Sequence, residues 1–369
     1  MSRLKVILSG GGTGGHIFPA VAIANEIKSI VPDVEILFVG ALGKMEMEKV
    51  PASGYKIIGL PIAGIQRKLT LANLKFPFLL LKSILKARSI VKEFKPNVVV
   101  GTGGYASGPL LRAATSMGIP ALIQEQNSYA GVTNKWLSKK ASKICVAYEG
   151  MEQFFPKEKI ILTGNPVRQD IKDIEQKRGE GQKFFKLDSN KKTLLVVGGS
   201  LGAKGINEAM GEGLSQFAEN DIQVIWQTGK VYIEKAKEQV KPFASKNIQA
   251  MDFISRMDLG YAVADVVVSR AGAGAVSELC IVKKPSILVP LLTAAEDHQT
   301  KNAMSLVNKN AAILIRDDET KTKLVKTAIS LMNDTAKQQE LSGNAGKLAL
   351  LNSANIIAKE VLKLTNYKP

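Results

Sequence analysis

Residues 10–16 read Gly10-Gly11-Gly12-Thr13-Gly14-Gly15-His16 and directly follow a short apolar run, Leu4–Ser9. Ile17-Phe18-Pro19 then opens a helical pattern, so the stretch is typical of a tight strand-to-helix turn. A strand, a glycine loop and a helix in this order begin a βαβ unit. The stretch therefore predicts an α/β fold with a parallel sheet.

Short apolar runs of the same kind recur along the chain, many followed by Gly, Ser or Asn and then a helix-like pattern. Their apolar residues are continuous rather than alternating, which suits strands buried on both faces of a parallel sheet. In the first half the predicted strands are Leu4–Ser9, Glu35–Val39, Asn97–Gly101, Ala121–Gln124 and Ile144–Ala147. In the second half they are Thr193–Val197, Val224–Gln227, Ile248–Phe253, Asp265–Ser269, Ser286–Val289 and Ala312–Ile315.

A polar stretch without predicted strands, Arg168–Lys192, separates the two series, and a linker is expected near Gly164–Arg168. At about 150 residues per domain, 369 residues also favour two domains. We therefore predict two Rossmann-like, doubly wound parallel-sheet domains facing each other across a cleft. The first comprises residues 1–165 plus a C-terminal helix of about 346–369 that crosses back onto it, and the second comprises residues 166–345.

Composition narrows the class of protein. With 45% hydrophobic and 22% charged residues, the chain is typical of a globular protein. Cys145 and Cys280 have no metal-site or disulfide spacing and are expected to be buried free thiols. The N-terminus does not resemble a signal peptide, and no run reaches the roughly 18 apolar residues of a membrane span. The expected location is the cytoplasm or the cytoplasmic face of a membrane.

The first glycine loop formally matches the dinucleotide-binding pattern, but a second requirement of that pattern is missing. The pattern needs an acidic residue at the end of the next strand, and this strand ends Phe38-Val39-Gly40. The remaining interpretation is a nest of backbone N–H groups at a helix start, which favours an anion or an oxygen-rich ligand. His16 is then either a general base or a helix-start residue bonded to the backbone.

Three further glycine loops follow predicted strands, at Gly101–Pro109, Gly198–Gly205 and Ser269–Ala275, and the last runs into a helix that carries Glu278. Each alone could be tight strand-to-helix packing. Four such loops, divided between two domains, predict a cleft for a phosphate-rich donor and a second polar ligand.

At these loops the sequence resembles the MurG family, the bacterial UDP-N-acetylglucosamine–lipid I N-acetylglucosaminyltransferases. The blocks that carry the resemblance lie in order from Gly10 to Ala303: GGGTGGHIFPA, GTGGYASGP, QEQNSYAGVTNKWL, TGNPVR, GGSLGAKGIN, SRAGAGAVSELC and HQTKNA. The resemblance implies an inverting enzyme of the two-domain GT-B fold. It implies transfer of GlcNAc from UDP-GlcNAc to the 4-hydroxyl of the MurNAc unit of undecaprenyl-linked lipid I. No cofactor is expected, and because no D-x-D-type acidic pair stands out in the sequence, no tightly bound metal is expected either.

The resemblance also implies site residues. On the donor side Glu278 would accept the ribose hydroxyls, Ser200 would hold the diphosphate, Arg168 would reach the nucleotide, and backbone groups of Ile254 would contact uracil. The remaining donor positions are Ala273, Gly274, Ala275 and Gln299. The acceptor positions are Thr13, Gly14, Gly15, Gly103, Gly104, Tyr105, Glu125, Asn127 and Asn134. His16 would take the acceptor proton as general base.

The net charge is +17, and residues 1–168 hold 22 Lys and Arg against 10 Asp and Glu. Within them, residues 67–95 contain eight basic residues and one acid, interleaved with leucine and phenylalanine. This segment is either a core helix with a solvated basic face or a surface that contacts an anionic membrane, and the lipid-linked acceptor of the family favours the membrane.

Four other functions compete with this prediction. The same fold could serve a UDP-sugar glycolipid synthase or a UDP-GlcNAc 2-epimerase, or a UDP-sugar sensor without turnover. A nucleic-acid binder is suggested by the basic charge alone, but aromatic residues are only 6% and no nucleic-acid motif is present. No nucleic-acid partner is therefore expected.

Overall fold

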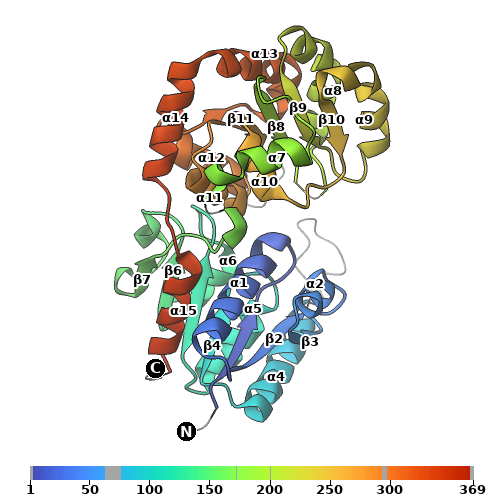
Figure 1. Ribbon diagram of the computed structural model, residues 1–369. Coiled ribbons are helices and arrows are strands. Elements are labelled where there is room, and N and C mark those ends of the chain that lie inside the picture. The colour runs from blue at the N-terminus through green and yellow to red at the C-terminus, as the bar shows by residue number, and fades with distance from the viewer. Residues whose placement is uncertain (1–2, 63–75, 172, 200, 293–296, 366–369) are drawn as a thin grey trace. The chain divides into compact units, whose positions relative to one another are not determined.

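The chain forms two α/β units, each built on one parallel sheet (Figure 1). The computed structural model describes residues 3–62, 76–171, 173–199, 201–292 and 297–365. Unit 1 comprises Met1–Val167 with Leu351–Pro369, and unit 2 comprises Arg168–Leu350. The two parallel sheets confirm the predicted fold class.

Unit 1 contains a seven-stranded sheet in the order β3-β2-β1-β4-β5-β6-β7. Its strands are β1 (Lys5–Ser9), β2 (Glu35–Ala41), β3 (Lys56–Leu60), β4 (Val98–Gly101), β5 (Ala121–Glu125), β6 (Lys143–Val146) and β7 (Ile160–Leu162). Its helices are α1 (Gly14–Ile30), α2 (Glu46–Ala52), α4 (Phe76–Phe94), α5 (Ser107–Ser116), α6 (Val132–Ser138) and α15 (Ser353–Lys363).

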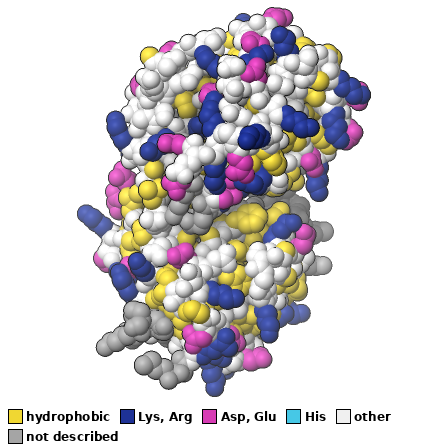
Figure 2. All heavy atoms as spheres, in the orientation of Figure 1, with side chains coloured by type: hydrophobic (Ala, Val, Ile, Leu, Met, Phe, Trp, Pro, Cys, Tyr) yellow, Lys and Arg dark blue, Asp and Glu magenta, His cyan; other side chains and the backbone are white. Residues whose placement is uncertain are grey.

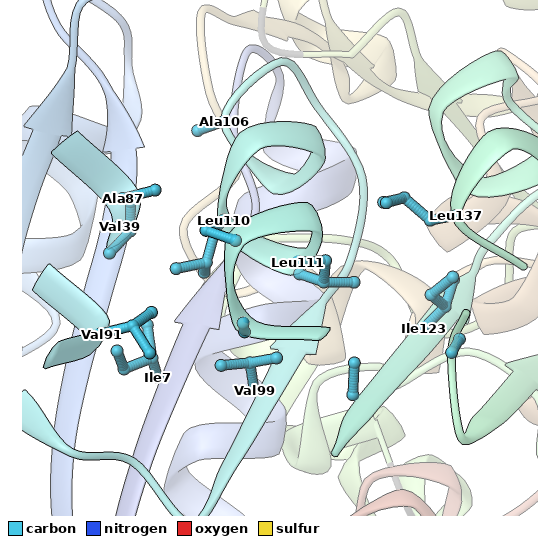
Figure 3. Close-up of a cluster of buried hydrophobic side chains, with 14 of the residues drawn as sticks. Ile7, Val39, Ala87, Val91, Val99, Ala106, Leu110, Leu111, Ile123 and Leu137 are labelled. Atoms are coloured by element: carbon cyan, nitrogen blue, oxygen red, sulfur yellow. The ribbon is translucent and has the colours of Figure 1, made fainter. Parts of the chain in front are cut away.

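Alternate residues of the unit 1 strands serve two different cores, as the period of two in a strand requires. Ile7 and Val99 pack with Leu110 of α5 and Val91 of α4 on one face, where the side chains converge (Figure 3). The neighbouring strand residues face α1 and α15 on the other side; Val6, Leu8, Val98 and Val100 pack there with Ile17 and Ile357. The strands are therefore covered on both faces, as continuous apolar runs predict.

Unit 2 contains a six-stranded sheet in the order β10-β9-β8-β11-β12-β13. Its strands are β8 (Thr193–Val197), β9 (Gln223–Gln227), β10 (Ile248–Met251), β11 (Val266–Ser269), β12 (Ser286–Leu288) and β13 (Ile313–Leu314). Its helices are α7 (Arg178–Phe184), α8 (Lys204–Glu219), α9 (Ile233–Val240), α10 (Met257–Val263), α11 (Ala273–Val282), α12 (His298–Val307), α13 (Thr320–Asn333) and α14 (Thr335–Lys347).

The sequence predictions differ from the structure at a few places. Every predicted strand is present with its ends shifted by at most two residues, but β3 and β7 were not predicted. The final segment is not one helix, because α14 ends at Lys347 and α15 begins at Ser353. Asn352, which precedes α15, has a left-handed backbone with φ of 58° that interrupts helical geometry. Cys145 and Cys280 are buried free thiols, as expected.

Helix α4 shows that the basic, leucine-rich segment has two apolar faces. Its buried residues Ser83, Ala87, Ile90 and Val91 follow helical spacing and face the interior. A second stripe is exposed to solvent: Phe78 is 77% exposed, Leu81 58% and Leu85 59%. Residues 67–75 of the segment, including Lys75, lie outside the described residues. The buried face agrees with the interpretation as a core helix, and the exposed stripe is a second face that the unit 1 core does not cover.

Within the described residues, no helix combines the length and apolar character that crossing a bilayer requires. Lysine and arginine side chains are spread over the visible faces of both units (Figure 2).

The packing of α15 on unit 1 predicts a unit-specific loss of stability. Ile357→Ala empties a fully buried site of the α1–α15 core and should cost about 2–5 kcal/mol of unfolding free energy. In a Trp136→Phe background, tryptophan fluorescence during urea unfolding reports unit 2 alone, because the other tryptophan, Trp226, is buried in that unit. Circular dichroism should show unfolding of part of the protein at a lower urea concentration than in the parent, while the fluorescence transition of Trp226 keeps its midpoint. The exposed neighbour Ile356→Ala is the control, and equal effects from both variants would contradict this packing.

Candidate active site

The first glycine loop leads into α1, and the helix begins earlier than the sequence predicts. It starts at Gly14 rather than at Ile17, with Thr13 as the N-cap, so His16 lies in the first helical turn. The backbone N–H groups of Thr13, Gly14 and Gly15 have no hydrogen-bond partner in the described part of the chain. Three donors at the positive end of a helix can bind oxygen atoms of a ligand.

His16 is held at both its backbone and its ring. Its carbonyl accepts a hydrogen bond from Thr102 Oγ1 at 2.7 Å, and its Nδ1 lies 3.0 Å from Gln126 Oε1. The side chain is half-buried, and Nε2 has no partner among the residues that the structure describes. One ring nitrogen is thus occupied by the protein and the other is available for a ligand. The alternative of a helix-start histidine whose ring bonds to the backbone is wrong, since the ring bonds to a side chain.

The second glycine loop, which follows β4, approaches His16 where only glycine fits. Gly103 has φ of +102°, and a Cβ there would lie 2.8 Å from His16 Nδ1. Gly104, with φ of +86°, would place a Cβ against the backbone of Gly11. Tyr105 is 47% exposed, and its ring edge lies beside Gly12. The loop therefore brings the predicted residues Gly103, Gly104 and Tyr105 together with the first glycine loop.

A buried carboxylate that sequence reasoning missed holds the first loop. Glu46 of α2 is fully buried, and it accepts hydrogen bonds from Gly12 N–H and from Ala41 N–H, each at 2.9 Å. Gly11 N–H donates to Gly103 O at 3.3 Å. The predicted nest is therefore only partly open, because the amides of Gly11 and Gly12 are bound within the protein. Glu46 lies five residues beyond Ala41, the last residue of β2, whereas the dinucleotide-binding pattern places its acidic residue at the end of the strand.

The third part of the unit 1 site is the loop after β5, which Glu125 organises. Glu125 is buried and receives four hydrogen bonds, from Asn127 N–H and Nδ2 through Oε1, and from Gly131 N–H and Asn134 Nδ2 through Oε2. Both oxygens are used internally, so Glu125 positions the loop. Asn134 Oδ1 is buried without a hydrogen-bond partner among the described residues, which marks an acceptor open to a donor group.

Unit 2 places Glu278 in α11 between two partners. Arg168 Nε donates to Oε1 at 3.1 Å, and the Tyr261 hydroxyl donates to Oε2 at 3.0 Å. Burial raises the pKa of the Glu278 carboxyl, and the charge of Arg168 opposes this rise. The structure thus joins the predicted Arg168 and Glu278 and adds Tyr261, which no sequence motif indicated.

The other predicted donor residues lie at the carboxyl end of the unit 2 sheet. Ala273, Gly274 and Ala275 form the first turn of α11, and a Cβ added at Gly274 would meet no atom within 4 Å. Ile254 is buried, and its N–H donates to Gln227 Oε1 at 3.4 Å. Gln299 Oε1 accepts from Leu291 N–H at 2.9 Å. Ser200 lies outside the described residues.

Gln227, which no sequence motif indicated, connects two of the unit 2 loops. Gln227 also donates through Nε2 to Gly199 O at 3.1 Å, so one side chain connects the loops after β8 and β10. Among the described residues there is no group of three or more His, Cys, Asp or Glu side chains placed to hold a metal ion.

Two parallel-sheet units with glycine-rich turns at the carboxyl ends of their strands are typical of two-domain nucleotide-binding proteins, among them the glycosyltransferases of the GT-B class. Comparison with known proteins agrees. The glycosyltransferase family 28 N-terminal domain matches residues 6–146, and the family 28 C-terminal domain matches residues 193–360. The chain belongs to glycosyltransferase family 28 and, within it, to the MurG family of UDP-N-acetylglucosamine–N-acetylmuramyl-(pentapeptide) pyrophosphoryl-undecaprenol N-acetylglucosamine transferases.

The similarity to this family extends over the whole chain. The transferase of that name from Flavobacterium psychrophilum is 57% identical, covering 99% of this chain and 98% of the relative. The one from Parabacteroides distasonis is 54% identical over the full length of both. The crystal structure of Acinetobacter baumannii MurG superposes with a TM-score of 0.80 at 29% identity, covering 98% of this chain and all of that one.

The tight approach at Gly103 predicts a sharp effect of one methyl group. In Gly103→Ala the new Cβ would push the His16 ring away, and a misplacement of about 1 Å can cost roughly 10²-fold in rate. Glycosyltransferase activity should fall by about that factor. Gly118→Ala is the matched control, because Gly118 has φ of +77° but no atom within 4 Å of a Cβ. Equal losses in the two variants would show that backbone strain, not the contact with His16, causes the effect.

Proposed function

We infer that this chain transfers GlcNAc from UDP-GlcNAc to the 4-hydroxyl of the MurNAc unit of undecaprenyl-linked lipid I, which forms lipid II in peptidoglycan synthesis. The observation that carries this inference is the identity of 57% over nearly the full length of a transferase whose name states those substrates. Because the identity spans both units, it includes the acceptor-side loops of unit 1 as well as the donor-side loops of unit 2.

The reaction we propose is one in-line displacement at the anomeric carbon of GlcNAc. The oxygen of the acceptor 4-hydroxyl forms a bond to that carbon while the bond to the UDP phosphate oxygen breaks. The anomeric configuration inverts from α to β, the electron pair leaves with UDP, and the acceptor proton passes to a base. The protein must therefore supply a base for the hydroxyl and stabilisation for the diphosphate.

His16 is the base in this proposal. Its position in the first turn of α1 leaves Nε2 without a partner among the described residues, beside three open backbone N–H groups. A hydroxyl held by those N–H groups would lie near a ring nitrogen that can accept its proton. Imidazole is suited to this step because it exchanges protons near neutral pH. We expect the acceptor side to include Thr13, Gly14, Gly15 and Tyr105.

The loop after β5 is proposed to recognise the acceptor through its two asparagines. Asn134 Oδ1 is buried without a partner in the part of the chain described, so a ligand hydroxyl or amide N–H could donate to it. Asn127 is anchored by Glu125 at its backbone and its side chain. In this proposal Glu125 contacts no substrate and instead holds both asparagines in place.

On the donor side, Glu278 is proposed to accept the ribose hydroxyls of UDP. Its oxygens already bind Arg168 and Tyr261, so the nucleotide would share or replace one of these hydrogen bonds. Ser200 and the first turn of α11, Ala273–Ala275, are proposed to hold the diphosphate. The positive end of a helix dipole stabilises the charge that develops on the leaving group. Gln299 and the carbonyl of Ile254 complete the donor set as sugar and uracil contacts.

We also propose that α4 rests on an anionic membrane at the cytoplasmic face, where the lipid-linked acceptor is held. Phe78, Leu81 and Leu85 form its exposed apolar stripe, and the exposed cations Lys82 and Arg88 lie on the same helix. Apolar side chains that enter the headgroup region, together with lysine and arginine, bind anionic lipid surfaces without spanning them. Lys86 is not counted among these cations, because its Nζ donates a hydrogen bond to Gly59 O at 2.8 Å within the protein.

The first test is UDP release from UDP-GlcNAc with and without a lipid I analogue. We expect release to require the acceptor, and His16→Ala to lower turnover by about 10²–10⁴-fold, the usual contribution of a general base. Calorimetric binding of UDP-GlcNAc to His16→Ala should stay unchanged, since the proposed donor residues lie in unit 2. Acceptor-independent release or epimerisation would contradict the transferase assignment, and near-normal turnover of His16→Ala would contradict the base assignment.

The second test measures membrane contact by vesicle flotation. The triple variant Phe78→Ser, Leu81→Ser, Leu85→Ser should lose binding to phosphatidylglycerol vesicles, because the apolar stripe supplies the burial. The control variant Phe184→Ser, Leu162→Ser removes exposed apolar side chains elsewhere and should bind as before. Wild-type binding should weaken with added salt. Retained binding of the triple variant would place the membrane contact elsewhere on the protein.

A further inference from the structure

A continuous chain of buried side-chain amides ends at His16. Gln124 Nε2 donates to Asn165 Oδ1 at 3.0 Å, Gln126 Nε2 donates to Gln124 Oε1, and Gln126 Oε1 faces His16 Nδ1 at 3.0 Å. The three amide residues are each at most 2% exposed. Gln124 lies in β5, Gln126 directly follows that strand, and Asn165 lies in the segment just before unit 2. Together with His16, these amides connect three segments that are distant in sequence.

Backbone carbonyls determine which way each amide points. Asn165 Nδ2 donates to the Gln126 carbonyl at 3.0 Å, and Gln126 Nε2 donates to the Thr102 carbonyl at 2.7 Å. A carbonyl can only accept a hydrogen bond, so the nitrogen of each amide must face it. The oxygen of Asn165 therefore points to Gln124, and the oxygen of Gln126 points to His16. The amides of Asn165 and Gln126, at the two ends of this hydrogen-bonded series, are thus oriented by two different backbone carbonyls.

This orientation decides where the proton of the His16 ring lies. Gln126 Oε1 is an acceptor, so the neighbouring Nδ1 must carry the hydrogen, and in the neutral ring Nε2 then keeps its lone pair. The opposite tautomer would place two acceptors against each other at 3.0 Å. The loop after β4 passes close to this edge of the ring, since a Cβ at Gly103 would lie 2.8 Å from Nδ1.

We propose that Gln126 is a positioning residue of the transfer reaction, held in register by Gln124 and Asn165, and that it keeps His16 in the Nδ1–H tautomer with Nε2 free to accept the proton of the acceptor hydroxyl. The proposal rests on the proposed function for the identity of the base. It adds that Gln126 sets the tautomer of His16 that can accept a proton, before any substrate binds. Gln126 contacts neither the reacting atoms nor the donor in this account and acts only through His16.

The tautomer can be observed directly, without any substrate. The chain has only two histidines, so a His298→Gln variant assigns the ¹⁵N-imidazole resonances of His16. Long-range ¹H–¹⁵N spectra of the wild type should show the Nδ1–H tautomer. Gln126→Met, which removes the acceptor at similar volume, should shift the ring toward Nε2–H. Gln126→Glu can replace both contacts as the neutral acid, with its O–H donating to the Thr102 carbonyl and its C=O facing Nδ1, and in that form it should restore the wild-type tautomer.

Kinetics separate positioning from a loss of packing. Gln126→Met should lower kcat by about 10- to 10²-fold, less than loss of the base itself, with KM for UDP-GlcNAc unchanged. Gln126→Glu as the neutral acid should recover most of kcat, because its C=O still accepts a hydrogen bond from Nδ1. Asn165→Leu should cost less than Gln126→Met, because the Thr102 carbonyl still anchors Gln126.

Gln223→Met is the matched control, since Gln223 of unit 2 is an equally buried and fully hydrogen-bonded glutamine. It should lower stability but leave the His16 spectrum and the pH profile unchanged. A wild-type Nε2–H tautomer, or a Gln126→Met spectrum identical to the wild type, would overturn the proposal. If the Nδ1–H tautomer is found but His16→Ala keeps its turnover, the base assignment fails while the amide chain stands.

Discussion

The backbone contact between the loops after β1 and β4 is the constraint on which the unit 1 site depends. Gly11 N–H donates to Gly103 O at 3.3 Å, and Gly104 leaves no space for a side chain against Gly11. These two loops are neighbours because the order of the sheet reverses between β1 and β4, the position where ligands bind in open α/β sheets. Without side chains between them, the second loop reaches the His16 ring and defines its position.

Unit 2 uses the same topology for different chemistry. Its strand order reverses between β8 and β11, and Arg270 N–H donates to Val197 O at 3.3 Å where the loops after these strands meet. The helix that follows, α11, carries Glu278, a carboxylate held by an arginine and a tyrosine hydroxyl. One unit thus presents a ring nitrogen and open backbone N–H groups, and the other presents a buried carboxylate and a helix N-terminus. This division suits an acceptor hydroxyl in unit 1 and a nucleotide in unit 2.

Much of the fold was predictable because parallel strands leave a local signal, a continuous apolar run before a glycine turn. β3 escaped prediction because Gly59 interrupts its apolar run, and β7 because it has only three residues. The site was predictable where glycines and His16 lie together in sequence. Glu46 and Gln126 were missed because their partners are distant in sequence. Glu46 binds Gly12, 34 residues away, and Gln126 contacts His16, 110 residues away. Nothing in the local sequence distinguishes the two from other polar residues. Ser200 remains a prediction from the family motif.

The central claim is a single in-line displacement at the anomeric carbon, and the stereochemistry of the product tests it most directly. A covalent sugar–enzyme intermediate would require two displacements and would retain the α configuration of the donor. Transfer from ¹³C-labelled UDP-GlcNAc to a lipid I analogue, followed by NMR of the new glycosidic bond, distinguishes the two. We predict a β-linked disaccharide as the sole transfer product. An α-linked product would contradict the account, because a single in-line displacement must invert the anomeric carbon.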